Sequence, residues 1–437
     1  MRTTILLSIL LFTAPTGGAI AQNLYFPPNG SNWDTLSPTA LGWCTDSIQP
    51  LYDFLDSTNS KAFLVLKDGR IVLEKYFDTF TQDSLWYWAS AGKTMTAFLV
   101  GMAQQEGLLS IEDTTSAYLG NGWTNCPPAK EEMITVRHQL SMTTGLDDGG
   151  GNNDCTDPAC LTYLADAGTR WAYHNAPYTL LDSVIENATG QTLNAYLFSK
   201  LSLSTGLFGA YVPVGYNNVL FSTPRALARF GLLMLANGTW NGTPIMTDQV
   251  YLNAMRSPSQ SLNESYGYLW WLNGQSSHML PGLQFVFPGP LCPNAPLDMY
   301  AAMGKNGQIL NVVPSQGLLV VRMGDLPDTT IFVPNFYNDD IWQRLNTVMC
   351  TNVAISEVAP VDRVVVHPNP ANGPVRVELD GNAGLRAVNA IAVDGRNRAL
   401  PFNGNTVNTE GLAEGTYTLL LRSTDDRLLR TRLVVVR

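Results

Sequence analysis

Two residues in one stretch of the chain have the types and the spacing that nucleophilic catalysis needs. Ser90 and Lys93 are three positions apart where a predicted helix, residues 93–102, begins, so their side chains share a face of the first turn. A serine hydroxyl needs a neighbouring base, and a lysine is a base only when it is neutral. A helix N-terminus and burial both lower a lysine pKa, and free N–H groups there, including that of Ser90, can face an oxyanion. The stretch therefore predicts acyl transfer, with Ser90 as nucleophile and Lys93 as general base.

Two other interpretations stay open on this motif alone, because roughly one Ser-x-x-Lys match is expected by chance in a chain of this length. The first is a helix-capping serine beside a solvated lysine. The second is a Ser-His-Asp triad, which the absence of a Gly-x-Ser-x-Gly elbow disfavours. The four histidines are scattered along the chain, at His138, His174, His278 and His367.

The composition and the first residues of the chain limit where the protein is expected to act and what it is expected to bind. Of the 437 residues 14% are charged, the net charge is −10, and no basic stripe is present, so nucleic acid is not an expected partner. Arg2, an apolar run over residues 5–12 and Ala19-Ile20-Ala21 are typical of a signal peptide, residues 1–21. The run is too short for a permanent membrane span, and no other stretch approaches 18 apolar residues. We therefore expect an exported mature chain that begins at Gln22.

The six cysteines fit an exported chain with disulfides. Cys155 and Cys160 lie in one loop and could pair locally. Cys44 and Cys350 would meet if the first and last helices of the large domain pack antiparallel. The Asp-rich loop 145–160 could hold calcium, but its spacing matches no EF-hand, so we predict a rigid loop that borders a cleft. No Cys-x-x-Cys pair is present, and we predict neither a metal nor an organic cofactor.

The elements that must position these residues follow from hydrophobic periodicity and turn signals. Helices are predicted over residues 46–57, 136–142 after a Thr135 cap, 178–187, 224–237 after a Thr223 cap, and 340–349. Strands are predicted over residues 62–66, 71–76, 266–271, 299–305, 308–313 and 318–321, with hairpin turns at Asp68-Gly69 and Asn306-Gly307. Strands at both ends with helices between them indicate an α/β (α+β) fold, with one antiparallel sheet built from both chain ends around an all-helical insert.

The composition changes after Cys350. From Asp362 onward the chain has ten arginines, eight acids and no lysine, with short β-rich runs between turn signals. These runs, over residues 363–366, 375–379, 388–393, 417–421 and 433–436, predict a small all-β sandwich. The predicted divisions are a signal peptide 1–21, an N-terminal extension 22–44, a large domain 45–351, a linker 352–362 and a C-terminal domain 363–437.

Three segments lie in the order Ser90 to Lys93, Tyr173-His174-Asn175 and Gly304-Lys305. With stretches 134–146, 225–231 and 266–271, they make residues 45–350 resemble the serine β-lactamase-related hydrolases, which include penicillin-recognising enzymes, esterases and 6-aminohexanoate-dimer hydrolases. The resemblance implies that Ser90 is acylated and that Lys93 is its base. It also implies that Tyr173 passes a proton to the leaving group and that Asn175 orients the substrate.

Two other Tyr-x-Asn matches, at Tyr216 and Tyr251, compete with Tyr173. Tyr251 lies in a predicted helix and Tyr216 in a loop. We prefer Tyr173 because the helix that follows it fits the context of the family.

The third segment departs from the family pattern, in which Lys-Thr-Gly supplies a cation and a hydroxyl to a substrate carboxylate. We match Gly304 to the motif's glycine, which makes the Lys305 N–H the second oxyanion donor and puts Ala302 at the lysine position. Lys305-Asn306-Gly307 is an alternative variant of the motif. The departure favours a small-molecule ester or linear amide substrate. A β-lactamase or D-alanyl-D-alanine carboxypeptidase is the alternative enzyme, and a non-catalytic surface binding protein is the alternative of another class.

The tail carries a resemblance of its own. Stretches 366–373, 394–396 and 415–417 are similar to the C-terminal sorting domain of the type IX secretion system of Bacteroidetes-type bacteria. This implies that residues 363–437 engage the type IX secretion machinery and that the protein is secreted or held at the cell surface. A carbohydrate- or protein-binding β module is the alternative.

Overall fold

The computed structural model describes residues 24–149, 151–327, 334–351, 364–379, 384–392, 397–424 and 428–436. The predicted signal peptide, the predicted start at Gln22 and the predicted linker 352–362 lie outside the described residues. Within the described ranges, no helix combines the length and the apolar character that a membrane crossing requires.

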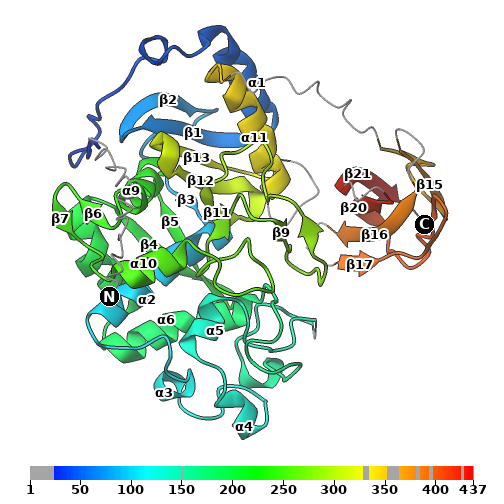
Figure 1. Ribbon diagram of the computed structural model, residues 1–437, viewed down its shortest axis with the longest axis horizontal. Helices are drawn as coiled ribbons and strands as arrows, with labels where there is room; N and C mark the ends of the chain where they lie inside the picture. Colours follow the sequence, from blue (N-terminus) through cyan, green and yellow to red (C-terminus); the bar gives the residue numbers. More distant parts are fainter. Residues whose placement is uncertain are drawn as a thin grey trace, which may run out of the picture.

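A six-stranded antiparallel sheet lies in the upper part of the large domain in Figure 1, in the order β2-β1-β13-β12-β11-β8. Its strands are β1 Ser60–Lys67, β2 Arg70–Tyr76, β8 Trp271–Leu272, β11 Tyr300–Gly304, β12 Gln308–Val313 and β13 Leu318–Gly324. Strand β1 pairs with β13, so the two ends of the domain meet inside the sheet. The predicted sheet built from both chain ends is confirmed.

Helices cover both faces of this sheet. On one face, Gly231 of α9 (Pro224–Leu235) packs so closely that an added Cβ would lie 2.6 Å from Leu310. On the other face, Asn338 of α11 (Asn335–Val348) exchanges hydrogen bonds of 2.7 and 2.8 Å with Asn311. Leu310 and Asn311 are neighbours in β12, so their side chains point to opposite faces. Helix α1 (Ile48–Ser57) packs beside α11.

The two predicted hairpin turns have different outcomes. Asp68 and Gly69 have φ angles of 50° and 84°, the left-handed pair of a type I′ turn, and Lys67 pairs with Arg70 as predicted. In the second hairpin the last pair is Gly304 with Gln308. Residues Lys305–Gly307 therefore form a three-residue turn, and Lys305 belongs to that turn and not to the strand.

The predicted strand over residues 266–271 is wrong. Only Trp271–Leu272 joins the sheet, as β8. Leu269 has a φ of 61°, and the chain reverses there so that Tyr266 forms a bridge with Trp271. Tyr266 and Trp270 have no exposed surface, so this turn is buried. The burial of the turn accounts for the apolar character of the run.

The helical insert lies between β2 and β11 in the sequence, and the part of it that includes α2 and α6 occupies the lower half of Figure 1. Its central helix α2 (Lys93–Gln105) begins at the predicted residue, and every side chain from Lys93 to Ala103 is buried. Helix α6 (Asn175–Thr189) packs against it. The remaining helices are α3 Ser116–Leu119, α4 Pro128–Glu131, α5 Val136–Leu140, α7 Leu193–Leu197, α8 Leu203–Thr205 and α10 Gln249–Met255.

The prediction that the insert is all-helical is wrong in one respect, because the insert also contains short strands. A three-stranded sheet has the order β3-β5-β4, with β3 Trp86–Tyr87, β4 Gly209–Val214 and β5 Asn217–Ser222. Two short hairpins pair β6 Thr239–Trp240 with β7 Thr243–Pro244, and β9 Ser277–His278 with β10 Phe287–Pro288. The predicted caps Thr135 and Thr223 both accept a backbone N–H in the first turn of their helices.

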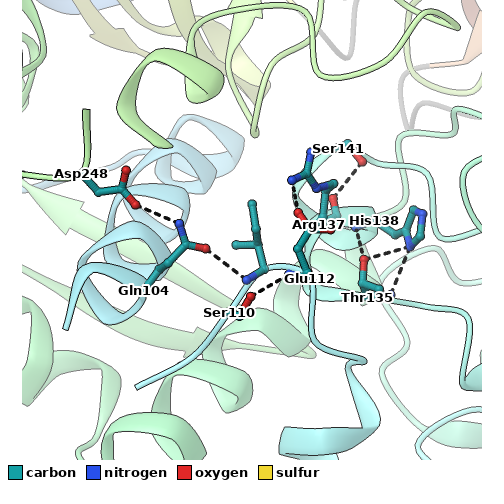
Figure 2. A network of polar contacts seen from close by, with 9 residues as sticks. Gln104, Ser110, Glu112, Thr135, Arg137, His138, Ser141 and Asp248 are labelled. Carbon is teal, nitrogen blue, oxygen red and sulfur yellow. Dashed lines mark hydrogen bonds and ion pairs between the residues drawn. The ribbon is translucent and has the colours of Figure 1, made fainter. Parts of the chain in front are cut away.

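The C-terminal end of α2 is fixed by the polar network in Figure 2. Gln104 donates to Asp248 of the α10 cap at 3.0 Å and accepts from the N–H of Ile111 at 3.1 Å. Glu112, the residue after Ile111, forms an ion pair with Arg137 of α5. The two hydrogen bonds of Gln104 hold α2 against its neighbours at the end away from Ser90.

The two cysteine pairs that the sequence left possible are both disulfides, Cys155–Cys160 in the loop and Cys44–Cys350 between the ends of the large domain. The other two cysteines are unpaired. The backbone N–H of Cys44 also donates to the carbonyl of Val348 at 2.8 Å. The start and the end of the large domain are therefore fastened together beside α11.

The C-terminal domain is the predicted all-β sandwich, with two four-stranded antiparallel sheets and its own apolar core. The sheet orders are β14-β15-β19-β18 and β17-β16-β20-β21. The strands are β14 Val365–His367, β15 Val375–Glu378, β16 Leu385–Ala392, β17 Asn397–Ala399, β18 Phe402–Asn403, β19 Thr406–Val407, β20 Gly415–Ser423 and β21 Leu428–Val435. The short strands β17 to β19 were not predicted.

Candidate active site

Ser90 lies in a short 3-10 turn, Ala89–Gly92, that leads directly into α2. Ala89 has a φ of 47°, a left-handed conformation that a non-glycine residue adopts only when its surroundings enforce it. Ser90 is partly exposed, whereas Lys93 is 3% exposed. Lys93 Nζ donates a hydrogen bond to Ser90 Oγ at 3.0 Å, so the predicted proximity of the two side chains is confirmed.

The surroundings of Lys93 favour its neutral form. Burial lowers its pKa from 10.5 to about 7, and the carboxylates of Asp154 and Asp182 oppose that shift. Its Nζ lies 4.2 Å from the ring centroid of Tyr178 and 5.2 Å from that of Tyr173. A lysine whose pKa is near 7 is largely neutral just above neutral pH, which is the state that a base requires.

Of the three Tyr-x-Asn candidates, the structure brings Tyr173 to Ser90. Burial raises the pKa of Tyr173, and a hydrogen bond with Ser90 opposes that rise. Its ring stacks on Trp271, with centroids 5.8 Å apart and an interplanar angle of 16°. Tyr216 instead donates to Asp157 at 2.8 Å, and Tyr251 donates to the carbonyl of Ala97 at 2.7 Å.

Asn175 begins α6 and is held by the Asp-rich loop. Its Nδ2 donates to Asp154 at 2.8 Å, and its backbone N–H donates to Asn153 Oδ1 at 3.2 Å. Its Oδ1 is buried and has no hydrogen-bond partner among the described residues, so the predicted role of Asn175 in orienting the substrate stays a prediction. The negative charge of Asp154 raises the pKa of Lys93, so the loop borders the site, as predicted.

The four aspartates of that loop each bind a protein group. Asp148 pairs with Arg170 at 2.6 Å, and Asp147 accepts from the N–H of Gly149 at 2.9 Å. The other two, Asp154 and Asp157, accept from an asparagine and a tyrosine as described above. These contacts tie each aspartate to another group of the protein.

Gly304 brings the end of β11 against the backbone of the Ser90 turn. A Cβ added at Gly304 would lie 2.4 Å from the carbonyl oxygen of Trp88 and 3.0 Å from the amide nitrogen of Ser90. Only glycine allows this approach, and the next residue is Lys305, whose side chain is exposed. The backbone amides of Ser90 and Lys305 therefore belong to two segments that touch, which is the arrangement an oxyanion site needs.

Two residues that the sequence did not single out fix the turn that contains Lys305. Arg322 is fully buried, and its Nη1 donates to the carbonyls of Asn306 at 2.6 Å and Gly307 at 3.1 Å. From the other side, Asn306 donates to the hydroxyl of Tyr87 at 2.7 Å. Tyr87 lies three residues before Ser90, so these contacts join the nucleophile turn to the hairpin turn.

No histidine contacts Ser90 in the part of the chain that the structure describes. His138 Nδ1 bonds Thr135 in the cap of α5, and His367 pairs with Glu378 in the C-terminal domain. His278 bonds the carbonyl of Gly289, and burial lowers the pKa of His174 to about 4. The histidine triad is therefore not formed.

A serine beside a buried amine, on a β-lactamase-like α/β fold, defines a serine hydrolase scaffold. The beta-lactamase family model matches residues 55–329, well over half of the chain, so the chain belongs to the β-lactamase family. An uncharacterized protein of Alkalihalophilus pseudofirmus is 23% identical over 314 residues, which cover 63% of this chain and 86% of that relative.

Two further relatives carry functional names. The 6-aminohexanoate-dimer hydrolase of Paenarthrobacter ureafaciens is 21% identical over 319 residues, covering 63% of this chain and 74% of that enzyme. The solved structure of a family VIII carboxylesterase is similar with a TM-score of 0.52 at 16% identity, covering 69% of this chain and 98% of that one. The second likeness concerns the fold alone.

Proposed function

We propose that this protein is a secreted serine hydrolase that cleaves an ester or a linear amide through an acyl-enzyme. The observation that carries the proposal is the 3.0 Å contact between a partly exposed Ser90 and a buried Lys93. Both members of the pair have the environment that their roles require, because the hydroxyl is open to a substrate and the amine is shielded from water.

The proposed acylation uses only groups of this chain. Neutral Lys93 takes the proton from Ser90 as Oγ attacks the carbonyl carbon, and the oxyanion is bound by the backbone amides of Ser90 and Lys305. Tyr173 passes a proton from Lys93 to the leaving alcohol or amine, and the bond to the leaving group breaks. Water then attacks the acyl-enzyme and gives its proton back along the same route, which frees the acid product and restores Ser90.

The residues of β11, the strand that ends beside the Ser90 turn, support an ester or linear amide substrate over a β-lactam. All five residues of β11 are buried, and Ala302 and Met303 stand where the family motif has a lysine and a hydroxyl, so these two positions offer no cation or hydroxyl to a substrate carboxylate. The similarity to a 6-aminohexanoate-dimer hydrolase, an enzyme named for a linear amide, points to the same substrate class.

We also infer that the protein is exported in two steps, with residues 363–437 as the type IX sorting domain. The Cys44–Cys350 disulfide supports an oxidising compartment, where such bonds persist. Replacing residues 363–437 by an unrelated β-domain in a bacterium with this secretion system should retain the protein in the periplasm. Undiminished surface or medium activity would contradict the inference.

Labelling with a fluorophosphonate probe tests the enzyme proposal. The purified mature chain and a Ser57→Ala control, changed at an exposed serine of α1, should label, while Ser90→Ala should not. An unlabelled wild-type protein would favour the non-catalytic binding protein. A panel of p-nitrophenyl esters, linear amides and nitrocefin then ranks substrates, and turnover of nitrocefin above the esters and amides would favour the β-lactamase alternative.

A further inference from the structure

A buried polar cluster lies directly behind Lys93. Tyr178 and Asp182 are four residues apart on α6 and share a face, and Thr96 is the next turn of α2 after Lys93. Thr96 Oγ1 donates to Asp182 Oδ1 at 3.4 Å and lies 3.1 Å from the hydroxyl of Tyr211. Tyr178 contacts both the amine and this cluster, because its ring centroid lies 4.2 Å from Lys93 Nζ and its hydroxyl lies 3.5 Å from Thr96 Oγ1.

Asp182 is a buried acid that has no hydrogen-bonded cation among the residues that the structure describes. It is 3% exposed, and its second oxygen accepts from Asn218 Nδ2 at 3.0 Å, so the contacts of both oxygens are with neutral groups. The charged group that acts on it favourably is Lys93, and Asp182 acts on Lys93 in return. A buried carboxyl paired only with neutral donors is costly, so its placement behind the base calls for an explanation.

Burial moves the pKa values of the two groups toward each other. It raises the pKa of Asp182 and lowers that of Lys93, so both groups exchange protons over the same pH range. The other titratable groups that face the pair are Asp154 of the Asp-rich loop, Tyr173 just before α6, Tyr178 and Glu186 on α6, and Tyr211 of β4.

We propose that Asp182 is a positioning residue that sets the proton affinity of the base, Lys93, through the buried cluster of Thr96, Tyr178 and Asn218. This inference rests on the proposed function of Ser90 and Lys93. As a carboxylate, Asp182 stabilises the ammonium form of Lys93, which strengthens the amine as a base. As a carboxylic acid, it leaves Lys93 neutral. The carboxyl therefore offsets part of the loss of basicity that burial imposes on Lys93.

The variant Asp182→Asn tests this assignment, because it keeps the shape and removes the charge at every pH. The rate of Ser90 phosphonylation by a fluorophosphonate is measured from pH 5 to 9, with Asp53→Asn as the matched control on the exposed face of α1. In Asp182→Asn we expect the acidic limb to move to lower pH by at least about half a unit, and the plateau rate to fall several-fold. The control should follow the wild-type profile.

The outcomes are distinguishable. A wild-type chain that is not labelled at any pH contradicts the proposed function itself. Labelling with superimposable acidic limbs in the wild type and a folded Asp182→Asn overturns the role of Asp182, because a merely structural residue would change stability and not the profile. Should Asp182→Asn fail to fold, Thr96→Val removes a donor to the carboxylate and is expected to move the limb in the same direction by a smaller amount. An unmoved limb in Thr96→Val would then overturn the proposal.

Discussion

Replacing Gly304 with alanine disturbs the contact between β11 and the nucleophile turn. The added Cβ would lie 2.4, 2.8 and 3.0 Å from the oxygen of Trp88 and the nitrogens of Ala91 and Ser90. All three are backbone atoms, so no rotamer change relieves the contact. Packed carbon atoms settle about 3.5 to 4 Å from their neighbours, so the strand end and the turn must separate by roughly 1 Å.

That displacement opens the site where the two backbone amides face the oxyanion. A misplacement of about 1 Å lowers the reaction rate roughly 100-fold. Loss of one oxyanion donor lowers kcat by about 100- to 1000-fold. We therefore expect kcat/KM for a p-nitrophenyl ester to fall by about 100- to 1000-fold in Gly304→Ala, or ~2.7 to 4 kcal/mol of transition-state stabilisation.

The assay compares kcat/KM at a temperature where thermal melts show each variant to be folded. Gly149→Ala is the matched control, because its Cβ would meet nothing closer than 3.4 Å. A folded Gly304→Ala enzyme that keeps kcat/KM within about threefold of the wild type would refute the reasoning, since the strand end would then not position the turn.

Three further perturbations test other parts of the site. Tyr173→Phe keeps the stack on Trp271 and should lower kcat by about 100-fold with little change in KM or melting temperature; unchanged steady-state rates would exclude the proton-shuttle role. Arg322→Met leaves the carbonyls of the Lys305 turn without donors, so urea unfolding should show a loss of about 2 to 4 kcal/mol and ester assays a fall in kcat/KM; equal stability and activity would contradict its supporting role. Lys93→Met should raise the free energy of unfolding by at least about 1 kcal/mol at pH 6. The folded chain resists protonating Lys93 below its ordinary pKa of 10.5, so this gain should be full below pH 7 and vanish as the pH rises toward 10.5; denaturant melts that show no pH trend would contradict the lowered pKa.

Local signals in the sequence predicted much of the framework. The Asp68-Gly69 turn, the Thr135 and Thr223 caps and the start of α2 at Lys93 depend on residues close in the chain, and all four formed as predicted. The proximity of Ser90 and Lys93 belongs to the same class, because a spacing of three residues fixes it within one helical turn.

What the sequence could not predict depends on contacts between distant residues. Arg322 supports the oxyanion turn from β13, and nothing in its local pattern distinguishes it from a surface arginine. Asp182 lies in the middle of an amphipathic helix, and only the packing of α6 on α2 places it behind Lys93. The aromatic run 266–271 was predicted as a strand because periodicity cannot distinguish a buried turn from a buried strand.

The most direct test of the central claim is the pH dependence of Ser90 phosphonylation in the wild type and in Lys93→Met. If a neutral Lys93 takes the proton from Ser90, the wild-type rate should rise with an apparent pKa near 7, and the variant should lose that limb and at least about 1000-fold in rate. A wild-type rate that rises only near pH 10, or a variant labelled as fast as the wild type, would contradict the account.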